Sequence, residues 1–99
     1  GKDIFLTKNV AFFLIFDDIY TLLGYQYGRT VFDTVKNQID YAEPITFVFP
    51  KHVKTIGDSF IHGFFAELMD EGGIEYIMKY VHVISDIKNL KNKIVETLM

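Results

Sequence analysis

Three short stretches of the chain are mostly apolar at consecutive positions, and we interpret them as strands of one sheet. They are Val10 to Phe16, Ile45 to Phe49 and Tyr80 to Ile84, and β-branched or aromatic residues dominate each of them. The first stretch is apolar on both alternating faces, which is typical of a strand that helices cover on both sides. Ile4 to Leu6 is a shorter candidate, and Thr7 to Asn9 would join it to the next strand as a hairpin.

Polar and glycine residues between these stretches indicate where helices begin and end. Asp17 or Asp18 is expected to cap a short helix that Gly24 ends. The segment from Gly24 to Gly28 is expected to be an aromatic-rich loop. Thr30 and Asp33 resemble a capping box, which predicts a helix from Thr30 to about Ile39.

The second half of the chain predicts two more helices. An apolar stripe at helical spacing precedes Gly72-Gly73, which is expected to end this helix, with a further helical turn over Ile74 to Lys79. Ser85 or Asp86 is expected to cap the last helix. The residues expected to face inward are Phe60, Phe64, Phe65, Leu68 and Met69 in the first of these helices, and Ile87, Leu90, Ile94 and Leu98 in the second.

The predicted order is therefore β-β-α-β-α-β-α. Strands that alternate with helices require crossover connections, which favour a small α/β fold with a mixed, mostly parallel four-stranded sheet and helices mainly on one side. Residues 45–49 and 80–84 are expected to be parallel neighbours in that sheet. A chain of 99 residues has room for one core, so we expect a single domain over residues 1–99.

Composition and charge narrow the class of function. The chain is 49% hydrophobic with ten Phe and six Tyr, which suffices for a filled core, and its net charge of −3 argues against a nucleic-acid partner. It contains no cysteine, so disulfides and thiolate metal sites are excluded. The longest strictly apolar run, Val10 to Phe16, is too short to cross a bilayer, and no signal peptide is evident. We expect a cytoplasmic protein without a membrane partner.

Asp58 and Ser59 are the best-defined candidate site, because they stand at the start of the predicted helix that carries the apolar stripe. A helix N-terminus exposes unpaired amides and the positive end of the helix dipole, which favours an anion or a phosphorylated serine there. The alternative is that one of the two residues only caps the helix. We expect Ser59 to lie in the first helical turn or just before it, with its hydroxyl accessible to solvent.

The remaining polar residues do not form a catalytic constellation. His62 follows Asp58 by one helical turn, but no oriented triad follows, and the histidines lack the spacing of a metal-binding helix. We therefore expect no enzyme activity, no metal and no cofactor. The candidates for an interaction face are Arg29 at a helix start, His62, and the basic cluster of Lys51, His52 and Lys54 in the loop before Ser59.

Ser59-Phe60 at a helix start, followed by Phe64-Phe65 in the same helix, resembles the pattern of the STAS-like family of bacterial domains, relatives of the anti-sigma factor antagonists. The resemblance covers roughly residues 28 to 98. In the anti-sigma factor antagonists this loop reads Asp-Ser-Ser-Gly and the second serine is phosphorylated. Ser59 falls on that serine, whereas Gly57, Asp58 and Phe60 differ from the motif. The resemblance is carried by Gly28-Arg29, Val53, Ile56, Ser59-Phe60, Phe64-Phe65, Leu68, Val81, Val83, Ile84, Ile87 and Ile94.

The resemblance implies a non-enzymatic regulatory domain that works by protein–protein interaction. A histidine-kinase-like ATPase is the partner that it implies, and a homodimer is compatible with this class. The implied control is phosphorylation at the start of the helix that follows the second long strand. The alternative from a different class is a domain that binds a small ligand or nucleotide at the same helix N-terminus.

Overall fold

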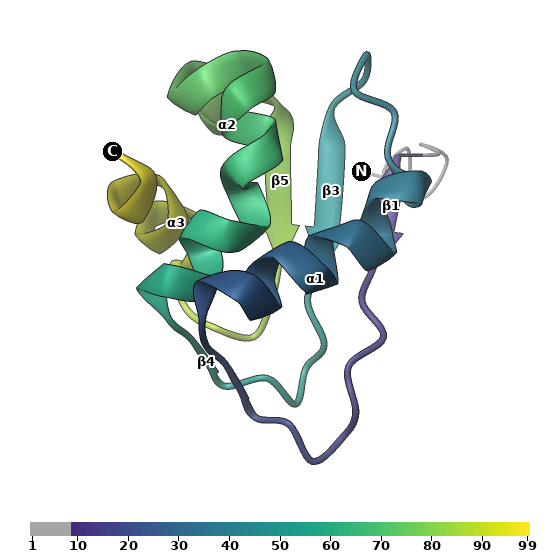
Figure 1. Cartoon of the computed structure of the whole chain (residues 1–99), viewed down its shortest axis with the longest axis vertical. Coiled ribbons are helices and arrows are strands. Elements are labelled where there is room, and N and C mark those ends of the chain that lie inside the picture. Colours follow the sequence, from purple (N-terminus) through teal and green to yellow (C-terminus); the bar gives the residue numbers. More distant parts are fainter. Residues whose placement is uncertain (1–8) are drawn as a thin grey trace.

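The computed structural model describes residues 9–99 and contains a three-stranded sheet with helices against one face (Figure 1). Its strands are β1 (Val10–Phe12), β3 (Ile45–Val48) and β5 (Val81–Ile84), in the order β1-β3-β5. Both neighbouring pairs are parallel. The α/β class and the placement of the three predicted strands in one sheet are therefore confirmed, including the parallel pairing of the last two.

Each parallel connection passes through a long helix. The chain leaves β1, forms α1 (Tyr25–Val35) and the 3-10 turn η2 (Lys36–Gln38), and returns to β3; it leaves β3 and returns to β5 through α2 (Asp58–Tyr80). The last helix, α3 (Leu90–Leu98), packs beside α2 and β5. Such crossovers are what parallel neighbours require, because a tight turn can join only antiparallel strands.

A second, two-stranded parallel sheet forms where a helix was predicted. β2 (Thr21–Leu22) pairs with β4 (Thr55–Ile56), so the described strands divide into three and two rather than forming one four-stranded sheet. The prediction of a helix capped by Asp17 or Asp18 is wrong, because long-range pairing satisfies this backbone: the Lys54 amide donates to Tyr20 O at 2.8 Å. The predicted strand Ile4 to Leu6 lies outside the described residues.

The first long helix begins earlier than its sequence indicates. α1 starts at Tyr25, and Gly24 precedes it with φ 95°, so the predicted loop from Gly24 to Gly28 and the capping box at Thr30 are both wrong. Gly28 explains the difference. It is buried against α2, where an added Cβ would lie 2.3 Å from Phe60 O, so close helix packing outweighs the low helical propensity of glycine.

The two later helices follow the predicted pattern of apolar residues, but their ends differ. Gly73 has φ 71° and interrupts α2, which confirms the predicted stop, and the helix resumes over the following residues to Tyr80. Asn89, with φ 57°, precedes α3, and no side chain caps that helix. The prediction that Ser85 or Asp86 caps it is wrong, because the Ser85 hydroxyl instead accepts from the Ile87 amide at 2.9 Å.

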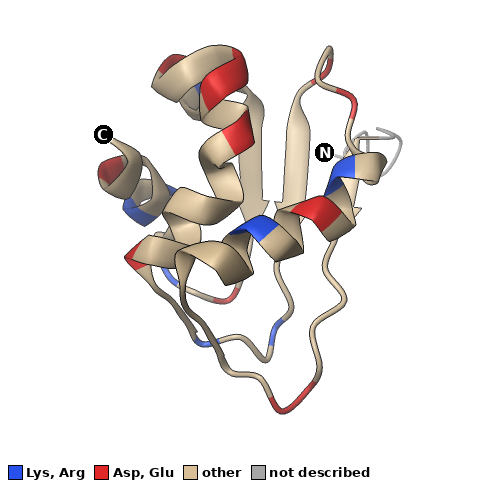
Figure 2. Cartoon of the chain, viewed as in Figure 1, with Lys and Arg blue, Asp and Glu red and all other residues tan. Residues whose placement is uncertain are grey.

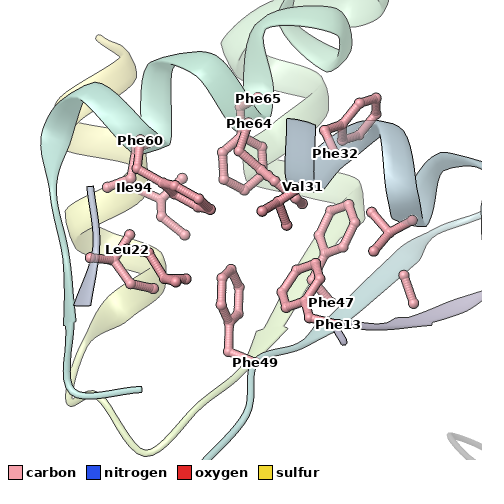
Figure 3. Packing of buried hydrophobic residues seen from close by; sticks show 14 of the residues in the cluster. Phe13, Leu22, Val31, Phe32, Phe47, Phe49, Phe60, Phe64, Phe65 and Ile94 are labelled. Atoms are coloured by element: carbon pink, nitrogen blue, oxygen red, sulfur yellow. The ribbon is translucent and has the colours of Figure 1, made fainter. Parts of the chain in front are cut away.

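Phenylalanine side chains fill the core between the sheet and the helices (Figure 3). Phe64 of α2 has no exposed surface, and its ring lies 5.3 Å from that of Phe13, 5.3 Å from that of Phe32 and 5.1 Å from that of Phe47, measured between centroids. These partners come from the β1 segment, α1 and β3. One side chain therefore joins both long helices to the sheet.

The first strand is shorter and less covered than its sequence predicts. β1 ends at Phe12, and the alternation of side chains continues along the following residues: Phe13 is buried, whereas Leu14 is 100% exposed. The prediction that helices cover this strand on both sides is wrong for residues 9–99, since α1 and α2 pack on one face only (Figure 1).

Candidate functional site

The first turn of α2 presents Asp58 and Ser59 at the surface. Gly57 is the residue before the helix, and its carbonyl accepts from the Ile61 amide at 3.1 Å. The amides of Asp58, Ser59 and Phe60 precede that bond and have no partner within the helix. Both Asp58 and Ser59 are exposed. The prediction that Ser59 lies in the first turn and is accessible to solvent is confirmed.

Neither residue caps the helix. Gly57 occupies the cap position, and no side-chain hydrogen bond closes the helix N-terminus within the described residues. The predicted capping role is therefore wrong. Gly57 occupies the cap position because the chain passes directly from β4 into α2. Its amide still pairs with the neighbouring strand, donating to Leu22 O at 2.8 Å.

Two side chains of α3 lie beside this turn. The Thr97 hydroxyl donates to Asp58 Oδ1 at 3.5 Å, and the Lys93 ammonium donates to the Ile56 carbonyl at 2.5 Å. Lys93 therefore sets a positive charge next to the free amides at the start of α2. The docking of α3 against α2 brings together residues that are 37 positions apart, so no local sequence pattern predicts this contact.

Exposed apolar side chains border the same turn. Leu23 is 57% exposed, and its Cδ2 atom lies 2.7 Å from the place that a Cβ on Gly57 would occupy. Tyr25 is 49% exposed, and its backbone packs against Gly63, one helical turn after Ser59. His62 is exposed on that turn as well. We name the set Leu23, Tyr25, Asp58, Ser59 and His62 the α2 N-terminal surface.

The predicted basic cluster does not lie on this surface. His52 contacts the segment after β1, with Nε2 at 2.9 Å from Phe16 O and Nδ1 at 4.0 Å from an Asp17 carboxylate oxygen. The Lys54 ammonium donates to Lys51 O at 3.2 Å, so these residues stabilise their own loop.

The predicted position of Arg29 at a helix start is wrong. Because α1 begins at Tyr25, Arg29 lies in its second turn and is half-buried. It follows Gly28, the residue at the crossing with α2, so Arg29 lies on the helix next to the α2 N-terminal surface.

Asp58 and His62 lie one helical turn apart on α2. Asp58 accepts from Thr97, and no ion pair joins it to His62 in the part of the chain that the structure describes. Within residues 9–99, no three side chains of the metal-binding types converge.

A shallow groove of about 280 Å³ lies elsewhere, between the end of α2 and α3. Lys91 spans it, donating to Met78 O at 3.4 Å and to Val81 O, and burial lowers the pKa of its ammonium. These bonds satisfy backbone carbonyls at the C-terminus of α2, a place where a cation is favoured. The residues that line the groove are Met78, Lys91, Asn92, Val95 and Glu96.

Charge is unevenly distributed over the molecule. Figure 2 shows acidic residues along the later turns of α2, and no Lys, Arg, Asp or Glu in the three strands β1, β3 and β5. No helix among the described residues is long and apolar enough to cross a membrane. Searches of protein-family models, curated proteins and solved structures find no match to this chain.

Proposed function

We propose that this chain is a non-enzymatic regulatory domain that docks to a protein partner through the α2 N-terminal surface. The observation that carries the proposal is the exposed Ser59 hydroxyl in a helical turn with free amides, bordered by the exposed side chains of Leu23 and Tyr25. Tyrosine and large apolar residues are favoured at interface centres, and a serine among them is well placed to control docking.

The control that we propose is phosphorylation of the Ser59 hydroxyl by the partner, a histidine-kinase-like ATPase in the interpretation that the STAS-like resemblance supports. The γ-phosphoryl group of ATP is transferred to Oγ, the hydroxyl proton is lost and ADP leaves. The phosphate brings nearly two negative charges and three acceptor oxygens to a turn with free amides. The Lys93 ammonium supports it electrostatically, whereas the Asp58 carboxylate next to it opposes it.

Photo-crosslinking identifies the partner and tests the surface. A photoreactive amino acid at Leu23 is expected to capture one dominant protein in cells that make this chain, and calorimetry then measures its affinity. Ser59→Asp should weaken binding by at least about tenfold, because the added charge is desolvated at the interface. Ser59→Ala should change the affinity by less than about threefold, since it adds no charge.

Asn37→Asp is the matched control, because it adds the same charge at an exposed position in η2, at the other end of α1. It should leave the affinity unchanged. Equal affinities of the wild type and Ser59→Asp would contradict the proposal. The alternative, a ligand site at the same helix N-terminus, predicts instead that the isolated chain binds ATP or inorganic phosphate in calorimetry and loses that binding in Ser59→Asp.

A further inference from the structure

The face of the three-stranded sheet that points away from the helices carries exposed apolar side chains. The outward positions form two rows across the sheet. Val10, Thr46 and His82 are in register in one row, and Phe12, Val48 and Ile84 in the next. Thr46 is buried between its neighbours, whereas His82 at the β5 end of the same row is exposed. The accessible apolar side chains are in the second row, in which Phe12 is 59% and Ile84 46% exposed. With Leu14 beyond β1, we name the set Phe12, Leu14, Val48 and Ile84 the open face.

An open face of this kind is unusual for a parallel sheet. Sheets made only of parallel strands are almost always covered on both faces. The described strand pairs are all parallel, and the described helices leave Phe12 and Ile84 exposed. Phe12 and Leu14 belong to the stretch whose sequence is apolar on both alternating faces, which itself predicts a covered strand.

The two edges of the sheet are less open to a partner than this face. The side-chain amide of Gln38 pairs with the outer edge of β1: the Phe12 amide donates to Gln38 Oε1 at 3.1 Å, and Gln38 Nε2 donates to Phe12 O at 3.2 Å. At the edge of β5, the Lys91 ammonium donates to Val81 O. Side-chain bonds of this kind block the addition of another strand, so a partner of this sheet docks against its face.

We propose that the open face docks against the open face of a second copy of this chain. The three strands that form this face contain no Lys, Arg, Asp or Glu, so two copies meet there without like-charge repulsion between those residue types (Figure 2). The row also complements itself: a two-fold axis along β3 sets Phe12 against Ile84 of the partner subunit, and Val48 lies at the axis. The layers of the dimer are then helix, sheet, sheet and helix.

The exposed area sets the expected strength of this dimer. At about 200 Å² for a large apolar side chain, the exposed fractions of Phe12, Leu14 and Ile84 amount to roughly 400 Å². A stable interface buries about 800 Å² on each partner, so the apolar centre fills about half of it and the surrounding polar residues complete it. We therefore expect a dimer that dissociates at micromolar concentration.

Sedimentation velocity over a range from low micromolar to millimolar protein tests the proposal. The wild type should shift from monomer to dimer as concentration rises. Phe12→Asp and Leu14→Asp should each raise the dissociation constant by at least about tenfold, because a carboxylate would be desolvated between the sheets. Leu14 is fully exposed and outside β1, so its variant keeps the fold even if Phe12→Asp does not. Tyr20→Asp is the matched control, at a similarly exposed aromatic residue on the segment before β2, and should dimerise like the wild type.

A cysteine crosslink supplies an independent measurement, since the chain has no cysteine of its own. Val48→Cys should form a disulfide-linked dimer under mild oxidation faster than Met78→Cys, which places the thiol at an exposed site on the helical side. A wild type that stays monomeric at every concentration overturns the proposal. The open face would then be covered by another segment of the chain or by a different protein. The proposal is also overturned by a dimer that Leu14→Asp leaves intact, or by a Val48→Cys crosslink no faster than that of Met78→Cys.

Discussion

Removal of the Phe64 ring should cost a large part of the stability of this domain. Phe64 has no exposed surface, and its ring contacts aromatic rings from the segment just after β1, from β3 and from both long helices. Truncation of a buried Phe to Ala typically costs about 3–5 kcal/mol, from the lost transfer of the ring and the cavity that remains. The partners of Phe64 belong to several elements, which cannot all move inward to fill the cavity left by the ring. We therefore expect the loss of unfolding free energy in Phe64→Ala to lie in the upper half of that range.

Urea unfolding followed by circular dichroism measures this cost. A domain of this size has a total stability of about 5–15 kcal/mol, so Phe64→Ala should lower the midpoint strongly, and Phe64→Leu, which keeps most of the volume, should lower it much less. Phe12→Ala is the control, because its ring is 59% exposed and its loss should cost under about 1 kcal/mol. A loss below about 1 kcal/mol for Phe64→Ala would refute the packing described above.

Three further substitutions test other contacts. Asn9 is buried and donates to the carbonyls of Asp40, Glu43 and Pro44 at 2.8–3.0 Å, so Asn9→Ala should lower the unfolding free energy by about 2–4 kcal/mol in urea, and an effect under about 0.5 kcal/mol would contradict this. Gly63→Ala should lower the melting temperature despite the better helical propensity of Ala, because the new Cβ would lie 2.0 Å from the Tyr25 carbonyl oxygen; an unchanged or higher value would show that the crossing of α1 and α2 is looser. Burial, and then the hydrogen bond to Glu67, raise the pKa of Tyr41 from 10.0 to about 12. As pH rises, the unfolded chain therefore loses the Tyr41 hydroxyl proton before the folded chain does, and the unfolding free energy should fall between pH 10 and 12. In Tyr41→Phe this fall should be shallower, and the same dependence of unfolding free energy on pH in both proteins would contradict a contribution of Tyr41.

The central strands could be predicted from sequence because each signal is local. Pro44 and Pro50 bracket the stretch that forms β3, and consecutive apolar residues identify it without reference to the rest of the chain. The phase of the apolar stripe in α2 likewise predicts an exposed Ser59 one position before Phe60. These features depend on residues within one or two helical turns of each other.

The start of α1 and the pairing of β2 with β4 could not be predicted in this way. Gly28 disfavours a helix by its own propensity, and only the approach of Phe60 of α2 shows why a glycine is required there. Thr21 and Leu22 form a strand of two residues, too short to leave a periodic pattern, and they are stabilised by pairing with residues more than thirty positions later. Lys93 and Thr97 were missed beside Asp58 for the same reason.

The two proposed surfaces lie in different layers of the molecule, so a substitution in one should not affect binding at the other. Ser59 is at the start of a helix that packs on one face of the sheet, whereas Phe12 and Ile84 point from the opposite face. A charge at position 59 therefore does not contact the open face, and Ser59→Asp should leave the dissociation constant of the dimer unchanged. In a dimer joined through the open faces, both copies keep the α2 N-terminal surface accessible, so one dimer presents two docking sites to a partner. If the partner is itself dimeric, its second subunit binds the second copy of this chain at a high effective concentration. Modest affinity at each α2 N-terminal surface then suffices for stable binding.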